Sequence, residues 1–251
     1  RDRLRSRGLG DVYKRQVYLS ENNTVKSRSL AASLIKQGSV EVNGRICTKA
    51  SFAVDDNDNI RIIGEMPKYV GRGGLKLEKA LSHYRLHLDG SVCIDIGAST
   101  GGFTDCMLQN GAVKVYSVDV GTDQLDEKLR NDSRVVSMEK TDIRNCVGAL
   151  PAVDFIGIDV SFISLKLVLP SAYALLKDGG ECVALIKPQF EAGKSHLSKH
   201  GIVRDSKVHK KVCDDISEFA STLGFERGEV ISSPITGGDG NTEYLIYLRR
   251  L

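Results

Sequence analysis

The sequence predicts an α/β protein in which a small basic α+β module precedes a mostly parallel sheet covered by helices. From Leu88 onward, apolar runs of strand length alternate with helical patterns, an order that gives parallel strands with helices on both faces. Before residue 65 this alternation is absent, and two short helical patterns lead into a strand–turn–strand signal. The change of pattern divides the chain into two modules.

Seven short apolar runs are the expected strands of the large module, which we assign to residues 81–251. They lie at 92–96, 115–119, 135–138, 154–159, 181–187, 226–232 and 243–249, with helices in most gaps between them. Residues 65–80 form a basic, glycine-rich linker that continues into this module, and its glycines are expected to make it flexible. Residues 1–16 have no apolar periodicity and are expected to be a disordered leader.

Residues 17–64 form the front module. Helical patterns at 17–22 and 27–37 come first, and Leu34 lies with its apolar neighbours on one face of the second. The run VEVNGR at 40–45 follows, in which an Asn-Gly turn joins two strand-like segments. We therefore expect a small α+β domain.

Basic residues mark the front module and the linker. The stretch from 24 to 45 holds several bases and one acid, Glu41, although a solvated helix face gives the same charge pattern. The helical pair, the basic helix and the V-x-V-N-G hairpin together resemble an S4 RNA-binding domain. That resemblance implies contacts with the phosphates of structured RNA, and a basic glycine-rich linker also suits phosphate approach. The candidate RNA-binding residues are Arg28, Lys36, Arg45, Lys68 and Arg72.

The composition is that of an ordinary globular protein. Of 251 residues, 41% are hydrophobic and 27% charged, which excludes collagen-like and largely disordered chains. No apolar stretch reaches the roughly 20 residues of a membrane-spanning helix, and the basic start lacks the apolar block of a secretory signal. The six cysteines form no C-x-x-C pair, and His196 and His200 lack a third ligand at sensible spacing. We expect a cytoplasmic, monomeric protein without disulfides or metal.

A glycine-rich turn after the first strand of the large module is the central signal. The segment VCIDIGASTGGFTDCML, at 92–108, passes from strand through turn to helix, so that backbone can approach a ligand closely. The proposed ligand-binding residues are Asp95, Gly97, Ser99, Gly101, Gly102 and Phe103. Ser99 stands where a dinucleotide fingerprint requires a second glycine, and Asp95 would repel a diphosphate yet orient an amine-bearing ligand. The turn therefore favours a cofactor without a pyrophosphate.

Two further acids complete this predicted pocket. Asp119 ends the second strand, 22 residues beyond Gly97, where a carboxylate can accept bonds from both hydroxyls of a ribose. Asp142 follows the third strand and could meet an adenine amino group, or could merely cap a short helix. Together with the glycine turn, these acids predict an S-adenosylmethionine site rather than an NAD site.

Charged residues at three later strand ends predict a catalytic centre. Asp159 and Lys187 end the fourth and fifth strands, and Glu243 begins the last. A lysine flanked by carboxylates can activate a weak hydroxyl nucleophile, as a base or as an electrostatic stabiliser. A structural ion-pair network would have the same composition.

The order of the motifs resembles the TlyA family, also called haemolysin A. The segments that carry the resemblance are GRGGLK, DIGASTGGFTDCML, IDVSFISL, LIKPQFE, GIVRD and GNTEY, within residues 17–251. The resemblance implies an RNA ribose 2′-O-methyltransferase with an S4 domain ahead of an FtsJ-like domain, acting on ribosomal RNA or ribosomal subunits. The family's Lys-Asp-Lys-Glu tetrad then falls on Lys76, Asp159, Lys187 and Glu243.

Three functions were weighed from the sequence. Methyl transfer to a ribose 2′-hydroxyl of ribosomal RNA, with a cytidine as the expected target, accounts for all four tetrad positions. A membrane-active haemolysin is disfavoured because the chain has no spanning helix and no strongly amphipathic cationic helix. A non-catalytic RNA-binding or ribosome-assembly factor would be expected to lack the lysines and acids of the tetrad.

Overall fold

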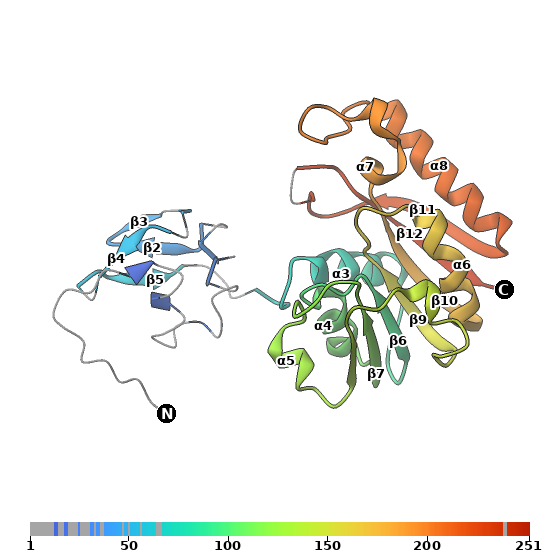
Figure 1. Cartoon of the computed structure of the whole chain (residues 1–251), viewed down its shortest axis with the longest axis horizontal. Coiled ribbons are helices and arrows are strands. Elements are labelled where there is room, and N and C mark those ends of the chain that lie inside the picture. The colour runs from blue at the N-terminus through green and yellow to red at the C-terminus, as the bar shows by residue number, and fades with distance from the viewer. Residues whose placement is uncertain are drawn as a thin grey trace. The chain divides into compact units, whose positions relative to one another are not determined.

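The computed structural model divides the chain into two compact units, residues 1–66 and residues 67–251 (Figure 1). In unit 2 it describes residues 67–237 and 240–251. In unit 1 it describes residues 13–14, 18–19, 25, 31–32, 34–35, 38–46, 48–49, 51–55 and 57–63. Each unit has its own apolar core.

Unit 2 is built on a seven-stranded sheet with the strand order β11-β12-β10-β9-β6-β7-β8. The strands are β6 (Val92–Ile96), β7 (Lys114–Val118), β8 (Val135–Met138), β9 (Val153–Ile158), β10 (Leu176–Ile186), β11 (Phe225–Ser232) and β12 (Tyr244–Arg250). Strands β6 to β10 pair in parallel, whereas β12 runs antiparallel to both its neighbours. The predicted mostly parallel sheet is confirmed.

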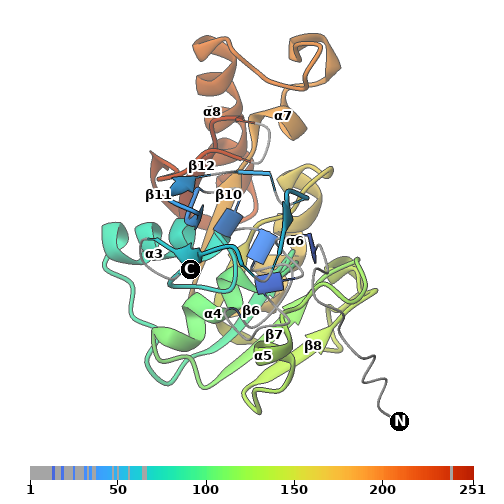
Figure 2. The same ribbon diagram turned by 90° about the vertical axis from the view of Figure 1, so that its left-hand side faces the viewer.

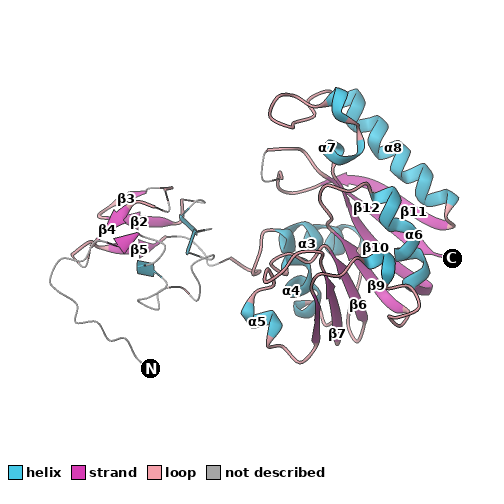
Figure 3. Ribbon diagram, in the orientation of Figure 1, coloured by secondary structure: helices cyan, strands magenta, loops and turns pink. Residues whose placement is uncertain are grey.

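Helices cover both faces of this sheet (Figure 3). They are α3 (Gly73–Tyr84), α4 (Gly102–Gln109), α5 (Glu127–Arg130), α6 (Leu165–Leu175), α7 (Pro188–Glu191) and α8 (Ser206–Thr222), with 3₁₀ turns η1 (Ile143–Asn145) and η2 (Lys194–His196). Side chains alternate across each strand, so Ile94 and Ile96 pack with α6 and α8, whereas Cys93 packs with α3 and α4. The result is one apolar core on each face, as expected for strands buried on both sides.

The reversed direction of β12 decides which residues can meet at the sheet edge. Tyr244, the first residue of β12, is in register with Ile186, the last residue of β10. The start of an antiparallel strand therefore lies at the same edge as the carboxyl ends of the parallel strands. This is why Glu243, just before β12, lies beside Lys187, just after β10.

The glycines of the predicted linker are packed rather than flexible. A Cβ on Gly71 would lie 2.6 Å from Thr100 Oγ1, and one on Gly74 would overlap the ring of Tyr69. A Cβ on Gly102 would lie 2.9 Å from the nitrogen of Gly74. The expectation of flexibility is wrong for this stretch, because its glycines let the starts of α3 and α4 touch backbone to backbone.

Unit 1 contains a three-stranded sheet with the order β3-β2-β5. Its strands are β2 (Val40–Val42), β3 (Arg45–Ile46) and β5 (Ile60–Ile62). The predicted Asn-Gly hairpin is present, with Asn43 and Gly44 at φ 50° and 78°, the left-handed pair that a type I′ turn requires. Residues 18–19, 31–32 and 34–35 are helical, and the rest of the two predicted helices lies outside the described residues.

Part of the expected leader is ordered. Strand β1 (Tyr13–Lys14) pairs antiparallel with β4 (Ala53–Val54). The expectation of disorder is wrong for these two residues, because their backbone groups bond to β4. The other residues of 1–16 lie outside the described part of the chain.

Candidate active site

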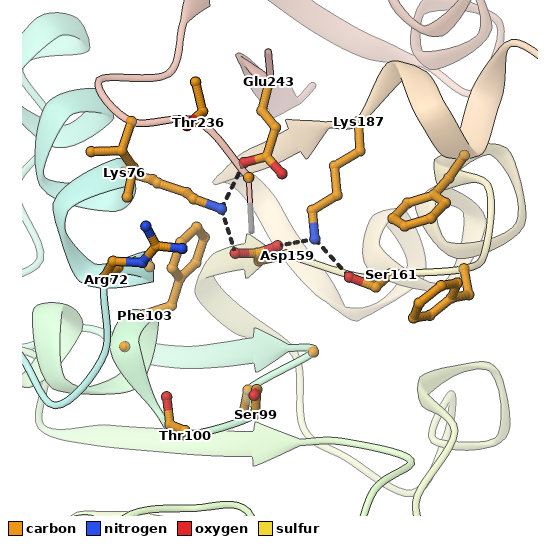
Figure 4. Close-up of a pocket in the computed structure, with 18 of the residues that line it drawn as sticks. Arg72, Lys76, Ser99, Thr100, Phe103, Asp159, Ser161, Lys187, Thr236 and Glu243 are labelled. Atoms are coloured by element: carbon orange, nitrogen blue, oxygen red, sulfur yellow. Dashed lines mark hydrogen bonds and ion pairs between the residues drawn. The ribbon is translucent and has the colours of Figure 1, made fainter. Parts of the chain in front are cut away.

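The four tetrad residues meet in one cavity of about 350 Å³ at the carboxyl edge of the sheet (Figure 4). Lys76 comes from α3, Asp159 directly follows β9, Lys187 directly follows β10, and Glu243 directly precedes β12. Four elements far apart in sequence thus contribute one charged group each.

The charged groups form a continuous chain across the cavity. Lys187 Nζ lies 2.6 Å from Asp159 Oδ1 and donates to Ser161 Oγ at 2.8 Å. Lys76 Nζ lies 3.4 Å from the other oxygen of Asp159 and 2.7 Å from Glu243 Oε2. The carboxylate of Asp159 therefore bridges the two ammonium groups, and the two positive and two negative charges balance.

The charged groups of the tetrad are largely buried, so each of them needs a partner of opposite charge. Lys76 and Lys187 are each 8% exposed, and Glu243 is 3% exposed. Buried charges are tolerated only when they are paired, because the desolvation of an isolated ion is costly. A Cβ on Gly237 would lie 2.7 Å from Glu243 Oε1, so the loop before β12 closes directly over that carboxylate.

Two aromatic rings stand at the rim of the cavity. Phe162 follows Ser161 and is 91% exposed, with φ at 64°, an unusual conformation for a bulky residue. Its ring centroid lies 4.9 Å from that of Phe190, and Lys187 Nζ lies 5.9 Å from the Phe190 centroid. An exposed apolar ring in a strained conformation indicates a binding surface rather than a core contact.

A second cavity of about 430 Å³ lies behind the first. It is lined by the acids Asp119 and Asp142 and by apolar side chains that include Ile143 and Val168. The two cavities share the wall formed by Gly97, Ser99, Asp159, Ser161 and Phe162. A ligand in the second cavity could therefore present one end to the tetrad through this wall.

The two acids of the second cavity are held differently. Asp119 accepts the backbone N–H groups of Ser99 at 2.8 Å and Gly121 at 2.7 Å, one on each oxygen, so each oxygen keeps a free lone pair. Asp142 caps η1 by accepting the N–H of Arg144 at 2.9 Å. The Arg144 guanidinium binds the same carboxylate at 2.6 Å and lowers the pKa of Asp142. Both alternatives considered for Asp142, cap and pocket wall, are therefore compatible with its position.

The residues of the glycine-rich turn allow a left-handed backbone and a close approach of the neighbouring strand. Gly97 has φ 85°, and a Cβ there would lie 2.5 Å from the carbonyl oxygen of Asp159. Ser99 has φ 48°, the left-handed conformation that glycine adopts easily. Gly102 and Phe103 line the tetrad cavity rather than the second one.

Two predicted cofactor residues line neither cavity. A Cβ on Gly101 would lie 2.2 Å from Leu129 Cδ1, so this glycine makes room for α5. Asp95 is fully buried, and its Oδ2 accepts both the N–H and the hydroxyl of Thr104 on α4. Both residues pack behind the turn, and their role in cofactor binding stays a prediction. Burial raises the pKa of Asp95 to about 7, and its Oδ1 accepts no hydrogen bond from any described residue.

The predicted RNA-binding residues lie in three different settings. Arg45 is exposed on β3, and Lys68 forms an exposed ion pair with Glu78. Arg72 precedes α3 and lines the tetrad cavity. Arg28 and Lys36 lie outside the described residues.

Several cavity residues were not predicted as site residues, although four of them lie within the motifs IDVSFISL and LIKPQFE that carry the family resemblance. Ser161 and Phe162 lie two and three residues after Asp159, so the strand-end argument applied to Asp159 could have found them. Gln189 and Phe190 follow Lys187 in the same way. Ile235, Thr236 and Gly237 come from the loop before β12, where nothing in the sequence distinguishes them.

The described residues contain neither a metal-binding cluster nor a membrane-spanning helix. No group of three or more His, Cys, Asp or Glu side chains that could hold a metal ion occurs there. Nor does that part of the chain contain a helix with the length and apolar character needed to cross a bilayer.

Comparison with known proteins assigns both units. The FtsJ-like methyltransferase family matches residues 69–250, and the S4 domain family matches residues 16–60. The chain is 46% identical to "Putative rRNA methyltransferase YqxC" of Bacillus subtilis, over 92% of this chain and 84% of that protein. It is 38% identical to "16S/23S rRNA (cytidine-2'-O)-methyltransferase TlyA" of Mycobacterium tuberculosis, over 92% of this chain and 87% of that protein.

A solved structure agrees with these matches. The structure titled "Putative hemolysin from Streptococcus thermophilus" superposes with a TM-score of 0.76 at 45% identity, covering 95% of this chain and 88% of that one. The family matches, the extent of the identities and the order of the two domains all agree. The chain belongs to the TlyA family, in which an S4 domain precedes an FtsJ-like methyltransferase domain.

Proposed function

We propose that this protein transfers the methyl group of S-adenosylmethionine to the 2′-hydroxyl of a cytidine ribose in ribosomal RNA. The observation that carries the proposal is the chain of charges from Lys187 through Asp159 and Lys76 to Glu243. It lies across a shared wall from a cavity with the carboxylate acceptors and apolar side chains that suit an adenosyl group.

The second cavity fits the proposed cofactor. Asp119 retains lone pairs at the end of β7, where ribose hydroxyls can donate to them. Ile143 and Val168 supply an apolar surface for a flat base, and Asp142 can accept from an exocyclic amino group. S-adenosylmethionine, when bound, supplies an electrophilic methyl group on a sulfonium centre.

The residues of the tetrad orient the hydroxyl and stabilise the charge that develops on its oxygen. The O–CH3 bond would form as the S–CH3 bond breaks, leaving a neutral thioether, and the hydroxyl proton would be released to solvent. An ammonium group has three N–H donors, and Lys187 uses two of them on Asp159 and Ser161. The third is free to meet a substrate oxygen in the cavity. A positive group fixed before the reaction stabilises negative charge without further reorganisation. Asp159 and Lys76 hold Lys187 in position, and Glu243 completes the network.

The substrate assignment rests on relatives and on the S4 domain. A protein 38% identical to this one is named a 16S/23S rRNA cytidine-2′-O-methyltransferase, and S4 is an RNA-binding module by the resemblance discussed above. A ribosomal substrate implies a cytoplasmic location. We also expect a monomer, which light scattering of the purified protein would test.

Methylation of isolated ribosomal subunits tests the proposal directly. The protein is incubated with each subunit and cofactor labelled in the methyl group, and the modified nucleotide is located by nuclease mapping. Label in a cytidine ribose is the expected result. Label in a base, or none in either subunit, would refute the proposed reaction.

A further inference from the structure

A strongly basic surface lies on unit 2 outside the tetrad cavity. Residues 196–211 hold five Lys and Arg and a single acid, a formal balance of +4, compared with +3 for the whole chain. We call the five exposed cations, Lys199, Arg204, Lys207, Lys210 and Lys211, the α8 patch. Lys210 pairs with Asp214, and the other four form no ion pair with any described residue.

The charge distribution along α8 is opposite to what helix stability favours. Three lysines lie within the first six residues of α8, and after the N-cap Asp205 the acids Asp214, Asp215 and Glu218 lie from its midpoint onward. Acids near the start of a helix and bases near its end are the stabilising arrangement. Within the fold only Lys210 is used, in its pair with Asp214, so an anionic partner is the better explanation for Lys207 and Lys211.

The segment that precedes Arg204 is fixed by hydrogen bonds, some of which join it to the chain just before β12. Val203 is buried, and its carbonyl accepts from His209 Nε2 at 2.9 Å. The amide of Asn241 bonds to both sides of this segment, accepting from Val203 N–H at 3.3 Å and donating to the carbonyl of Gly201 at 3.2 Å. Arg204 therefore follows a segment fixed to the chain just before Glu243.

The α8 patch is connected to the tetrad cavity through α7. Helix α7 begins immediately after Lys187 and packs against α8. Both helices lie at the β10–β12–β11 end of the sheet, away from β8 (Figure 2). A polyanion held by the patch would thus be fixed relative to the cavity by short, well-packed connections.

We propose that the α8 patch binds phosphates of the RNA substrate, as a contact surface of unit 2 additional to the S4 domain. The proposal rests on the proposed function, which makes the substrate an RNA. Contacts of cations with phosphates position a nucleic acid without reading its sequence.

A membrane surface is the other polyanion that could bind lysines, and the structure disfavours it. A helix that binds a bilayer inserts an apolar face into it. The apolar face of α8, with Val212, Ile216 and Ala220, is already buried against the sheet. Between residues 195 and 222 no large hydrophobic side chain is exposed.

The test compares two charge-matched triple variants of the full chain. The patch variant carries Arg204→Glu, Lys207→Glu and Lys211→Glu. The control carries Lys114→Glu, Arg227→Glu and Arg249→Glu, three exposed cations that form no ion pair with a described residue. Affinity for purified ribosomal RNA is measured over a range of salt concentrations, and cofactor affinity is measured by calorimetry.

The patch variant should bind ribosomal RNA at least about tenfold more weakly than the control, with unchanged cofactor affinity. The dependence of log affinity on log salt should also become shallower by about two, because three phosphate contacts are lost. Since new acids near the start of α8 favour the helix, thermal stability should not fall. A lower stability would indicate misfolding and contradict the structural argument.

Equal RNA affinity of the two variants would overturn the proposal. So would loss of binding to vesicles of anionic phospholipid with unchanged RNA affinity, which would make the patch a membrane contact. Absence of methyl transfer by the wild-type protein would refute the proposed function instead, and the RNA affinities would still decide the role of the patch.

Discussion

The two cavities of unit 2 share a wall but differ in how their polar groups are satisfied. In the tetrad cavity each of the four tetrad side chains is held by another side chain, as Lys187 is by Asp159 and Ser161. In the second cavity Asp119 is held by backbone N–H groups. A network of side chains fails when one member is removed, whereas a backbone cradle keeps its shape. The first should therefore control the rate and the second the affinity for cofactor.

The largest effect is expected from Lys187→Ala. Removal of the ammonium leaves the developing negative charge of the hydroxyl oxygen unstabilised, and methyl transfer should slow by about 10²–10⁴-fold or more. Cofactor affinity should change little, because Lys187 does not line the second cavity. Single-turnover methylation at saturating cofactor measures the rate, and calorimetry measures the affinity.

A matched control lies on the same strand. Lys177, near the opposite end of β10, pairs with Asp154 at 2.6 Å and lines neither cavity, so Lys177→Ala should leave the rate unchanged. Lys187→Arg should restore little activity, because guanidinium differs in shape from ammonium. A near-normal rate for Lys187→Ala would remove Lys187 from the centre of the mechanism, and a loss of cofactor affinity alone would make it a binding residue.

Gly97→Ala should damage both cavities, because Gly97 belongs to their common wall. The new Cβ would lie 2.5 Å from a backbone oxygen of Asp159, so the bridging carboxylate must move. A displacement of this kind can cost on the order of 10²-fold in rate. Turnover and cofactor affinity should fall together, as steady-state kinetics and calorimetry would measure.

Gly148→Ala is the control that distinguishes the steric clash at position 97 from the strain of a left-handed alanine. Gly148 has φ 84°, nearly equal to the 85° of Gly97, yet a Cβ there would meet nothing within 4 Å. It should lose only the roughly 1–2 kcal/mol of a left-handed alanine and keep full activity. If Gly97→Ala behaved like Gly148→Ala, the shared wall would not couple the two cavities.

Asp119→Ala should affect affinity and leave the rate intact. Hydrogen bonds to a charged group contribute about 1.5–3 kcal/mol, so cofactor should bind about 10- to 100-fold more weakly. Asp142→Ala should have a smaller effect, because Arg144 already occupies that carboxylate. Calorimetry with S-adenosylmethionine and with NAD, which should not bind, tests both variants. A slow rate for Asp119→Ala at saturating cofactor would contradict the division of roles.

The smallest effect on turnover is expected from Asp95→Asn, because Asp95 lines neither cavity. Its effect should be on stability. Burial raises the pKa of Asp95 to about 7, so between about pH 4 and 7 the folded protein keeps a proton that the unfolded chain releases. The stability that Asp95 contributes is thus complete below about pH 4 and is lost as pH rises to 7.

Urea unfolding at pH 5 and pH 8 checks this sign. The asparagine variant has no proton to release at this position, so its free energy of unfolding should increase relative to wild type between the two pH values. An identical pH dependence for both proteins would mean that Asp95 titrates normally.

The strands could be predicted closely because apolar runs bounded by glycine and polar residues have few alternatives. The run at 92–96 is β6 without any shift, and that at 135–138 is β8. Periodicity also located the sheet edge at which three of the four tetrad residues lie. The family resemblance was needed for Lys76, because its helix begins inside a glycine-rich segment that local sequence describes as a linker.

The sequence could not predict which residues of the glycine-rich turn after β6 face a cavity and which face the helices behind it. Asp95 and Gly101 lie within the motif. Yet Asp95 accepts a hydrogen bond from Thr104, and Gly101 packs against Leu129. Adjacency in sequence does not tell whether a side chain points toward a ligand or toward the helix behind it. That distinction depends on α4 and α5, whose packing is set by residues distant in the chain.

The way in which the chain enters unit 2 determines where foreign modules can be attached. Val70 N–H donates to Asp105 Oδ2 at 2.9 Å, and Gln109 Nε2 donates to the carbonyl of Lys68 at 3.1 Å. Both bonds fasten the entering segment to α4. A displacement of the preceding chain is therefore resisted by α4 and is not transmitted to Lys76. A graft that joins another RNA-binding module ahead of this segment should preserve turnover, whereas a junction inside it would release the helix that carries Lys76.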